Sequence, residues 1–159
     1  MKLFRKLLTV VFSLATLLPA AAYAGDFGAS HRITGSVDRL IEINPHRVIE
    51  SVDPDTVGLP KTFVIDLQKR TMRGTPDSLV RRVASVDRIT RTPTTLVLQG
   101  VDEGLSGPGT VFGWNLAIDT ATGKSVLSAA GSGIAYVAYG TCWPSAAAQE
   151  SGTDGAPKK

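Results

Sequence analysis

Cysteine and histidine are almost absent from this 159-residue chain. The single cysteine, Cys142, excludes an internal disulfide and a cysteine-based metal site. The two histidines, His31 and His46, have no carboxylates spaced to complete a metal site with them. In an oxidising compartment a lone thiol is either buried or able to link two chains. Cys142 ends a predicted strand beside Trp143, so we expect burial, with a Cys142-linked dimer as the alternative.

Long apolar runs are also missing, except near the N-terminus. Leu7–Leu18 is apolar and ends at Pro19, but it is shorter than the ~20 residues that a membrane-spanning helix needs. Ala22-Tyr23-Ala24 matches a cleavage site, so residues 1–24 are predicted to be a signal peptide. No cysteine stands directly after the apolar run, which argues against a lipid anchor. We expect a bacterial periplasmic or secreted protein with no membrane association after cleavage.

A charge of one sign is lacking once the signal peptide is removed. The chain has 17 basic and 14 acidic residues, and Lys2, Arg5 and Lys6 supply the whole excess. The rest is formally neutral, so the high isoelectric point is no evidence for a nucleic-acid or membrane partner.

Basic residues are nevertheless concentrated between positions 61 and 91. Arg81 and Arg82 lie in this region, and a basic face there would suit an anionic lipid headgroup, a polysaccharide or an acidic protein. A solvated strand face balanced by acidic flanks is the simpler interpretation. We keep Arg81 and Arg82 as candidate partner contacts.

The clearest structural signal runs from Val111 to Cys142. Trp114, Leu116 and Ile118 alternate with polar or small residues, as in a strand with one buried face. Turns at 120–123 and 131–133 then separate two further strands, 124–129 and 134–139. The segment predicts three consecutive antiparallel strands.

The preceding residues predict more strands. We expect a loose lead-in over 25–31, a hairpin over 33–52, and strands over 62–67 and 94–101, the last paired with 83–89. Val83 and its apolar neighbours fit a strand slightly better than a helix, but Thr75-Pro76-Asp77 has the chemistry of a helix start. A short helix near 76–88 is therefore the alternative.

Short strands joined by turns rich in Gly, Pro and Asp predict one all-β domain over 25–144. The favoured architecture is an antiparallel meander forming a closed or half-open small barrel, with a two-sheet sandwich as the alternative. Residues 145–159 lack the apolar side chains needed for order and are expected to be a disordered tail. The expected core consists of Val37, Ile41, Phe63, Ile65, Leu67, Leu96, Leu98, Trp114, Leu116, Ile118, Ile134, Tyr136 and Ala138.

Two local motifs resemble cofactor sites but fail in detail. Residues 53–58 begin like a calcium loop, yet Val57 and Val64 occupy positions where oxygen ligands belong. Gly123-Lys124-Ser125 resembles the end of a phosphate-binding loop, but Ile118 stands at the first glycine position and no helix is expected to follow. We therefore expect no metal and no cofactor.

No catalytic motif is present either. Ser106 and Ser132 lie in glycine-rich turns, and neither belongs to a G-x-S-x-G sequence. A hydrolase would need His31 or His46 within hydrogen-bond reach of a serine and a carboxylate, which sequence alone cannot place. We predict that the chain is not an enzyme, with a small hydrolase as a minor alternative.

The segment Ser132-Gly133-Ile134-Ala135-Tyr136 matches S-G-x-x-Y. It resembles the signature loop of periplasmic C-type lysozyme inhibitors, small exported β-barrels that insert a loop into the lysozyme cleft. Those inhibitors also carry a later lysine-containing segment and a disulfide, whereas 139–142 here has no lysine and the chain has one cysteine. The resemblance implies inhibition of a cell-wall enzyme, with Ser132 and Tyr136 as contacts.

A broader resemblance covers 62–142. The order FVIDL, VASVDRI, LVLQG, GWNLAID-x-x-TGK and YVAYGTC is similar to that of small uncharacterised exported β-rich proteins of Proteobacteria. This resemblance implies export and a β-rich fold, and it assigns no catalytic residue.

The sequence therefore predicts a non-catalytic binding module for a small apolar ligand or a periplasmic or extracellular protein. Small barrels commonly hold a ligand inside or present loops to a protein. Binding of a ligand inside the barrel requires a roomy apolar cavity that opens beside Trp114 and Tyr136. The candidate contacts are Trp114, Ser132, Tyr136, Arg81 and Arg82.

Overall fold

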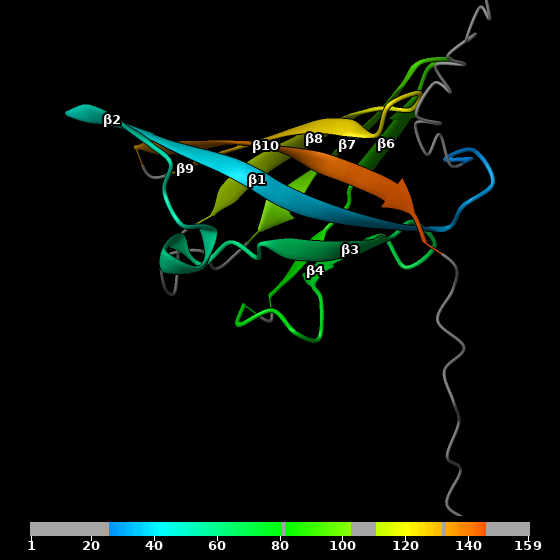
Figure 1. Cartoon of the computed structure of the whole chain (residues 1–159), viewed down its shortest axis with the longest axis horizontal. Coiled ribbons are helices and arrows are strands. Elements are labelled where there is room, and N and C mark those ends of the chain that lie inside the picture. The colour runs from blue at the N-terminus through cyan, green and yellow to red at the C-terminus, as the bar shows by residue number, and fades with distance from the viewer. Residues whose placement is uncertain (1–25, 81, 103–110, 132, 146–159) are drawn as a thin grey trace, which may run out of the picture.

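Alternating apolar side chains and turn-forming residues produce a chain built almost entirely of β-strands. The computed structural model describes residues 26–80, 82–102, 111–131 and 133–145 (Figure 1). The strands are β1 (Arg32–Asn44), β2 (Arg47–Glu50), β3 (Thr62–Asp66), β4 (Thr71–Gly74), β5 (Val83–Ser85), β6 (Arg88–Arg91), β7 (Thr95–Asp102), β8 (Phe112–Asp119), β9 (Lys124–Gly131) and β10 (Ile134–Pro144). One short 3-10 turn, η1 (Pro54–Val57), lies between β2 and β3. The all-β prediction is confirmed.

The strands form one curled antiparallel sheet in the order β5-β4-β3-β1-β10-β9-β8-β7-β6, and β2 pairs with the far end of β1. Figure 1 shows the sheet bending around a single core as a half-barrel. Strands β7 to β10 are a continuous meander, and β10 then pairs with β1 from the start of the fold. The half-open barrel is thus the observed architecture.

The two edges of the sheet approach each other through a two-residue link. Val86 and Asp87 join β5 at one edge to β6 at the other. The Val86 N–H donates to the Arg70 carbonyl at 2.9 Å, and the Asp87 N–H donates to the Gln99 carbonyl at 2.8 Å. A single strand over 83–89 is therefore wrong: β6 pairs with β7 as expected, but β5 pairs with β4. The chain breaks there because Val86, 1% exposed, turns into the core.

The alternative of a short helix near 76–88 is wrong for the described residues. Thr75 and Ser78 close a turn through the Ser78 N–H and the Thr75 carbonyl at 2.9 Å, and the chain then reaches β5 without a helix. Leu79, which would have faced the core from such a helix, is 85% exposed.

Most of the expected core residues are buried. Phe63, Ile65, Leu67, Leu96, Leu98, Trp114, Leu116, Ile118, Tyr136 and Ala138 belong to one contiguous cluster, with Val37 and Ile134 packed at its margin. Ile41 is the exception, because β1 has a bulge between Val37 and Arg39. One extra residue reverses the side-chain phase, so Leu40 is 1% exposed and Ile43 is 40% exposed.

The N-terminal lead-in is ordered rather than loose over its described residues. The Asp26 carboxylate accepts hydrogen bonds from the N–H groups of Gly28 and Ala29, at 2.8 and 3.2 Å. This turn directs Phe27 into the core, where it is 2% exposed, and Arg91 donates to the Phe27 carbonyl at 2.7 Å. Residues 26–30 therefore close one end of the half-barrel.

Other predictions fall outside the described residues. They concern the signal peptide over 1–24, most of the glycine-rich loop over 102–109, and the tail beyond residue 145. Within the described residues no helix has the length and apolarity to cross a bilayer.

Candidate functional site

Trp114 and Tyr136 are packing residues of the core. They are 5% and 7% exposed, and they alternate with Gly100 and Ala129 in one row of directly opposed residues across β7 to β10. Small residues in this row leave room for the two large rings, and Tyr136 also packs against Phe112 with ring centroids 6.0 Å apart. Burial raises the pKa of the Tyr136 phenol, with a further contribution from the charge of Glu42.

Buried side chains form one cluster on the inner side of the sheet beside these rings. Ile33, Ile65, Leu98 and Leu116 are at most 1% exposed and meet in the middle of the core cluster. The hollows found in the described residues are grooves at the surface, and none of them is lined by these four side chains. A roomy apolar cavity opening beside Trp114 and Tyr136 is therefore not the arrangement seen in this part of the chain.

Arg70 and Arg82 of the basic segment each make a separate contact within the fold. Arg82 lies 3.6 Å from the Asp102 carboxylate, with both side chains largely buried, and so links β5 to the end of β7. Arg70 donates to the Asp87 carbonyl at 2.9 Å. These contacts hold the two sheet edges together. Arg81 lies outside the described residues.

The described residues of the S-G-x-x-Y segment follow β9 directly and begin β10. Gly131, the last residue of β9, pairs directly with Ile134, the first of β10, so only two residues join the strands. Gly133 has φ of 79°, a conformation that glycine adopts without strain. Ser132 itself lies outside the described residues. A two-residue turn offers no loop for insertion into an enzyme cleft.

Cys142 points into the core, as expected. Its side chain is 1% exposed, and burial raises the pKa of the thiol to about 11, although a hydrogen bond with the Ser125 hydroxyl lowers it slightly. A thiol that stays protonated is a poor nucleophile. A Cys142-linked dimer stays a prediction that would require local opening of the strand.

Neither histidine is near the other. His31 and His46 flank the two ends of β1, which spans about 40 Å at the usual strand rise, and both are exposed. No group of three metal-ligating side chains occurs in the described residues. The absence of catalysis, metal and cofactor remains a prediction.

The acidic loop that resembles a calcium site has another role. Asp53 caps η1 by accepting a hydrogen bond from the Asp55 N–H at 3.0 Å. Lys61 lies 3.1 Å from the Asp53 carboxylate and 3.2 Å from that of Asp55. The hydrogen bond with Lys61 lowers the pKa of Asp53. A lysine therefore occupies the position between these carboxylates that a cation would need.

The outward face of the meander is the most unusual surface of the molecule. On β8, β9 and β10 the residues that alternate with the core carry no charge over nine central positions. These positions are Gly113, Asn115, Ala117, Val126, Ser128, Ala130, Ala135, Val137 and Tyr139. Together with the outward-facing Val97 and Gln99 of β7, we call this surface the outer face. An exposed sheet face normally carries polar and charged side chains.

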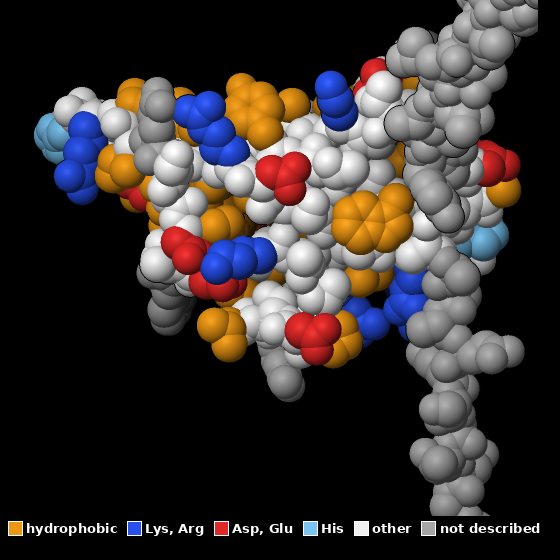
Figure 2. All heavy atoms as spheres, viewed as in Figure 1, with side chains coloured by type: hydrophobic (Ala, Val, Ile, Leu, Met, Phe, Trp, Pro, Cys, Tyr) orange, Lys and Arg blue, Asp and Glu red, His pale blue; other side chains and the backbone are white. Residues whose placement is uncertain are grey.

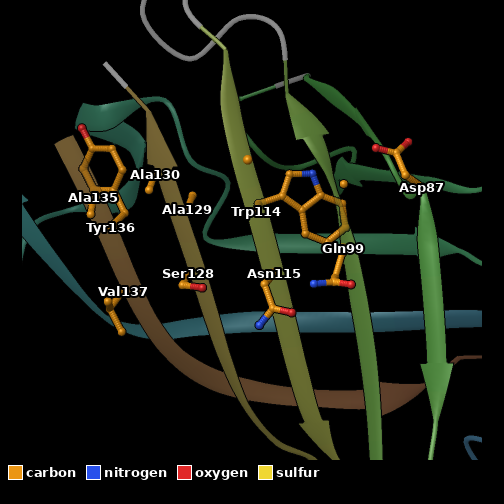
Figure 3. Close-up of a pocket in the computed structure, with 12 residues that line it drawn as sticks. Asp87, Gln99, Trp114, Asn115, Ser128, Ala129, Ala130, Ala135, Tyr136 and Val137 are labelled. Carbon is orange, nitrogen blue, oxygen red and sulfur yellow. The ribbon is translucent and has the colours of Figure 1, made fainter. Parts of the chain in front are cut away.

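Two cross-strand rows define the outer face. Gln99, Asn115, Ser128 and Val137 stand directly opposite one another on β7 to β10, as Figure 3 shows. The adjacent row consists of Val97, Ala117, Val126 and Tyr139. The first row places amide and hydroxyl groups on the surface, and the second places apolar groups beside them.

Small side chains make the outer face concave in two places. A groove of about 500 Å³ lies over the Gln99–Val137 row and the smaller Gly113, Ala130 and Ala135 beside it. A second groove, of about 560 Å³, lies over Ala117, Val126 and Tyr139 and ends at Asp119 and Lys124. Trp114 and Tyr136 border the first groove, but their side chains are buried on the other side of the sheet.

Comparisons with models of known protein families, with curated proteins and with solved structures found no match to this chain.

Proposed function

We propose that this chain is an exported, non-catalytic binding module that binds its partner through the outer face. The observation that carries the proposal is the run of nine uncharged outward positions on three neighbouring strands. Val126 and Tyr139 within it are 39% and 46% exposed. Contiguous exposed apolar surface on a small domain is a common mark of an interaction site.

The shape of the surface favours an extended or macromolecular partner. Both grooves are open and lie over the same strands, whereas the core side chains of the described fold form one buried cluster. A small apolar ligand enclosed in the barrel is therefore the weaker form of the proposal. Inhibition of a cell-wall enzyme through Ser132–Tyr136 loses its support in the two-residue turn.

Two further parts of the proposal, export and a lack of catalysis, rest on other observations. The charged, apolar and small-residue pattern of residues 1–24 supports export. The two histidines are exposed and lie at opposite ends of β1, so they cannot act together at one site, which supports a non-catalytic role.

Site-specific photo-crosslinking in the bacterial envelope tests this function. Benzoylphenylalanine would replace Val126 or Asn115 on the outer face, and Leu79 or Val48 elsewhere, which are 85% and 61% exposed. We expect a discrete crosslinked product from the two outer-face positions only. Equal crosslinking at all four positions, or none at the outer face, would show that this surface is not the binding site.

A further inference from the structure

The exposed aromatic residues of the described chain are Tyr139 and Trp143. They are 46% and 39% exposed, whereas the phenylalanines described and the other described tryptophan and tyrosine are at most 7% exposed. Both lie on β10, and both point away from the core because Ala138 and Cys142 point into it. Four residues separate them, so their attachment points are about 13 Å apart along the strand. Figure 2 shows hydrophobic side chains exposed on the side of the molecule that carries β1 and β10.

Hydrogen-bonding groups surround this pair. Thr141 lies between the two aromatic residues on the same side of β10, and Thr34 of β1 stands opposite Trp143. The groove beside Tyr139 contains Asp38 and Asp119. Hydrogen bonds from the Thr122 and Ala121 N–H groups lower the pKa of Asp119, which keeps that carboxylate ionised and able to accept hydrogen bonds. Apolar rings and polar acceptors therefore alternate along one line.

We infer that the partner of the outer face is a neutral glycan chain that lies along β10, stacks on Tyr139 and extends beyond the outer face to Trp143, on the same side of β10. This inference rests on the proposed function and names its ligand. A sugar ring presents C–H groups on its faces and hydroxyls at its rim, so it needs a flat apolar surface bordered by hydrogen-bonding groups. Aromatic side chains provide such surfaces, and their polar neighbours fix the orientation of a bound ligand.

Charge and area favour a neutral glycan over the other partners. Asp38, Asp119 and Lys124 all line the same groove, so no positive field there selects an acidic polymer. The outer face of four strands covers roughly 450 Å² at the usual strand spacing and rise. A stable protein interface covers ~800 Å² on each partner, so a protein would need surface beyond this face.

Titration with defined oligosaccharides tests the inference. The ligands are the hexamer of N-acetylglucosamine and the hexamer of β-linked glucose, both uncharged. We expect at least one of them to change the fluorescence of Trp143, while the buried Trp114 contributes a constant background. Replacing Trp143 by phenylalanine should remove the fluorescence change and keep binding detectable by calorimetry.

Variants locate the site. Tyr139→Ala and Trp143→Ala should each weaken binding by about tenfold or more, and Tyr139→Phe should retain it because the ring face is kept. Leu79→Ala, at a more exposed apolar residue away from β10, should bind as the parent does. Thermal unfolding of every variant shows whether a loss of binding reflects a loss of fold.

The outcomes separate this inference from the proposed function. If neither hexamer binds, or if Tyr139→Ala and Trp143→Ala bind normally, the glycan inference is wrong. Outer-face photo-crosslinks to a discrete protein in that case would leave the binding function standing with a different partner. Absence of both glycan binding and outer-face crosslinks would overturn both.

Discussion

The two faces of strands β7 to β10 carry opposite kinds of side chain on the same backbone. The inner face alternates large and small residues, such as Trp114 beside Gly100 and Ala129, and is sealed from solvent. The outer face is built from small, uncharged residues with Tyr139 at its margin, and it stays open. One strand thus holds two independent patterns: the inner positions specify the fold, and the outer positions are free to specify a partner.

The largest difference between the faces should follow from placing a charge on each. Leu98 is fully buried, so Leu98→Asp would leave an unpaired carboxylate in the core and cost more than about 4 kcal/mol. We expect no soluble folded protein, as judged by yield and circular dichroism. The neighbouring outward residue provides the control, since Gln99→Asp should fold normally. A folded Leu98→Asp variant would show that the two faces are assigned incorrectly.

Two glycines on adjacent strands give the next comparison. A Cβ at Gly100 would collide with the Ser85 carbonyl and lie 2.7 Å from the Trp114 ring, so Gly100→Ala should cost about 1–3 kcal/mol. A Cβ at Gly113, on the outer face of β8, meets nothing within 4 Å. Gly113→Ala should therefore leave stability unchanged or raise it by up to about 1 kcal/mol. Urea unfolding of both variants measures the contrast, and equal losses would contradict it.

The buried thiol should make stability depend on alkaline pH. Below pH 9 both folded and unfolded states keep the Cys142 proton, so this group has no effect there. Between pH 9 and 11 the unfolded state releases the proton while the folded state retains it, so stability falls as pH rises. The loss should reach roughly 2–3 kcal/mol at the upper limit.

The control for this prediction is Cys142→Ala, which removes the thiol and leaves every other titratable group in place. The free energy of unfolding of the parent should decrease more steeply than that of the variant between pH 9 and 11. Parallel curves would mean that the thiol is not protected from solvent.

The smallest effect on stability is expected on the outer face. Val126→Lys should change the free energy of unfolding by less than about 0.5 kcal/mol, because the side chain projects into solvent. The same substitution should abolish photo-crosslinking from position 115, whose side chain lies in the neighbouring row. Val48→Lys, at another exposed valine, should leave crosslinking intact. Retained crosslinking in Val126→Lys would place the partner elsewhere.

The inner pattern was readable from the sequence because it repeats over eight or more residues. Period-two alternation placed Leu116, Ile118 and Tyr136 in the core and located the turns between β8, β9 and β10. Where strands are only three or four residues long, as in β5 and β6, alternation has too few positions to define a strand or its partner. The link between the two sheet edges at Val86 therefore depends on contacts between residues distant in sequence.

Other features were hidden for specific physical reasons. The bulge near Asp38 lies beside a close approach of β1 to β10, where a Cβ at Gly140 would collide with the Ser36 carbonyl, so it depends on a strand distant in sequence. Phe27 is an isolated apolar residue whose burial requires the completed barrel end. The outer face was not predicted from the sequence because the aromatic residues nearest to it, Trp114 and Tyr136, point into the core. The sequence signal for the outer face was the absence of charge at alternate positions of β8, β9 and β10.

The pairing of β1 with β10 also sets the order in which the chain can fold. Ile33 lies opposite Pro144 and Ile43 opposite Ala135, so the first strand finds its long partner only after the last strand has been made. Contacts of such sequence separation form slowly, since the whole intervening chain must be ordered around them. The barrel consequently cannot close on the ribosome from its N-terminal half. The long β1–β10 pair is therefore the last part of the half-barrel that the growing chain can complete.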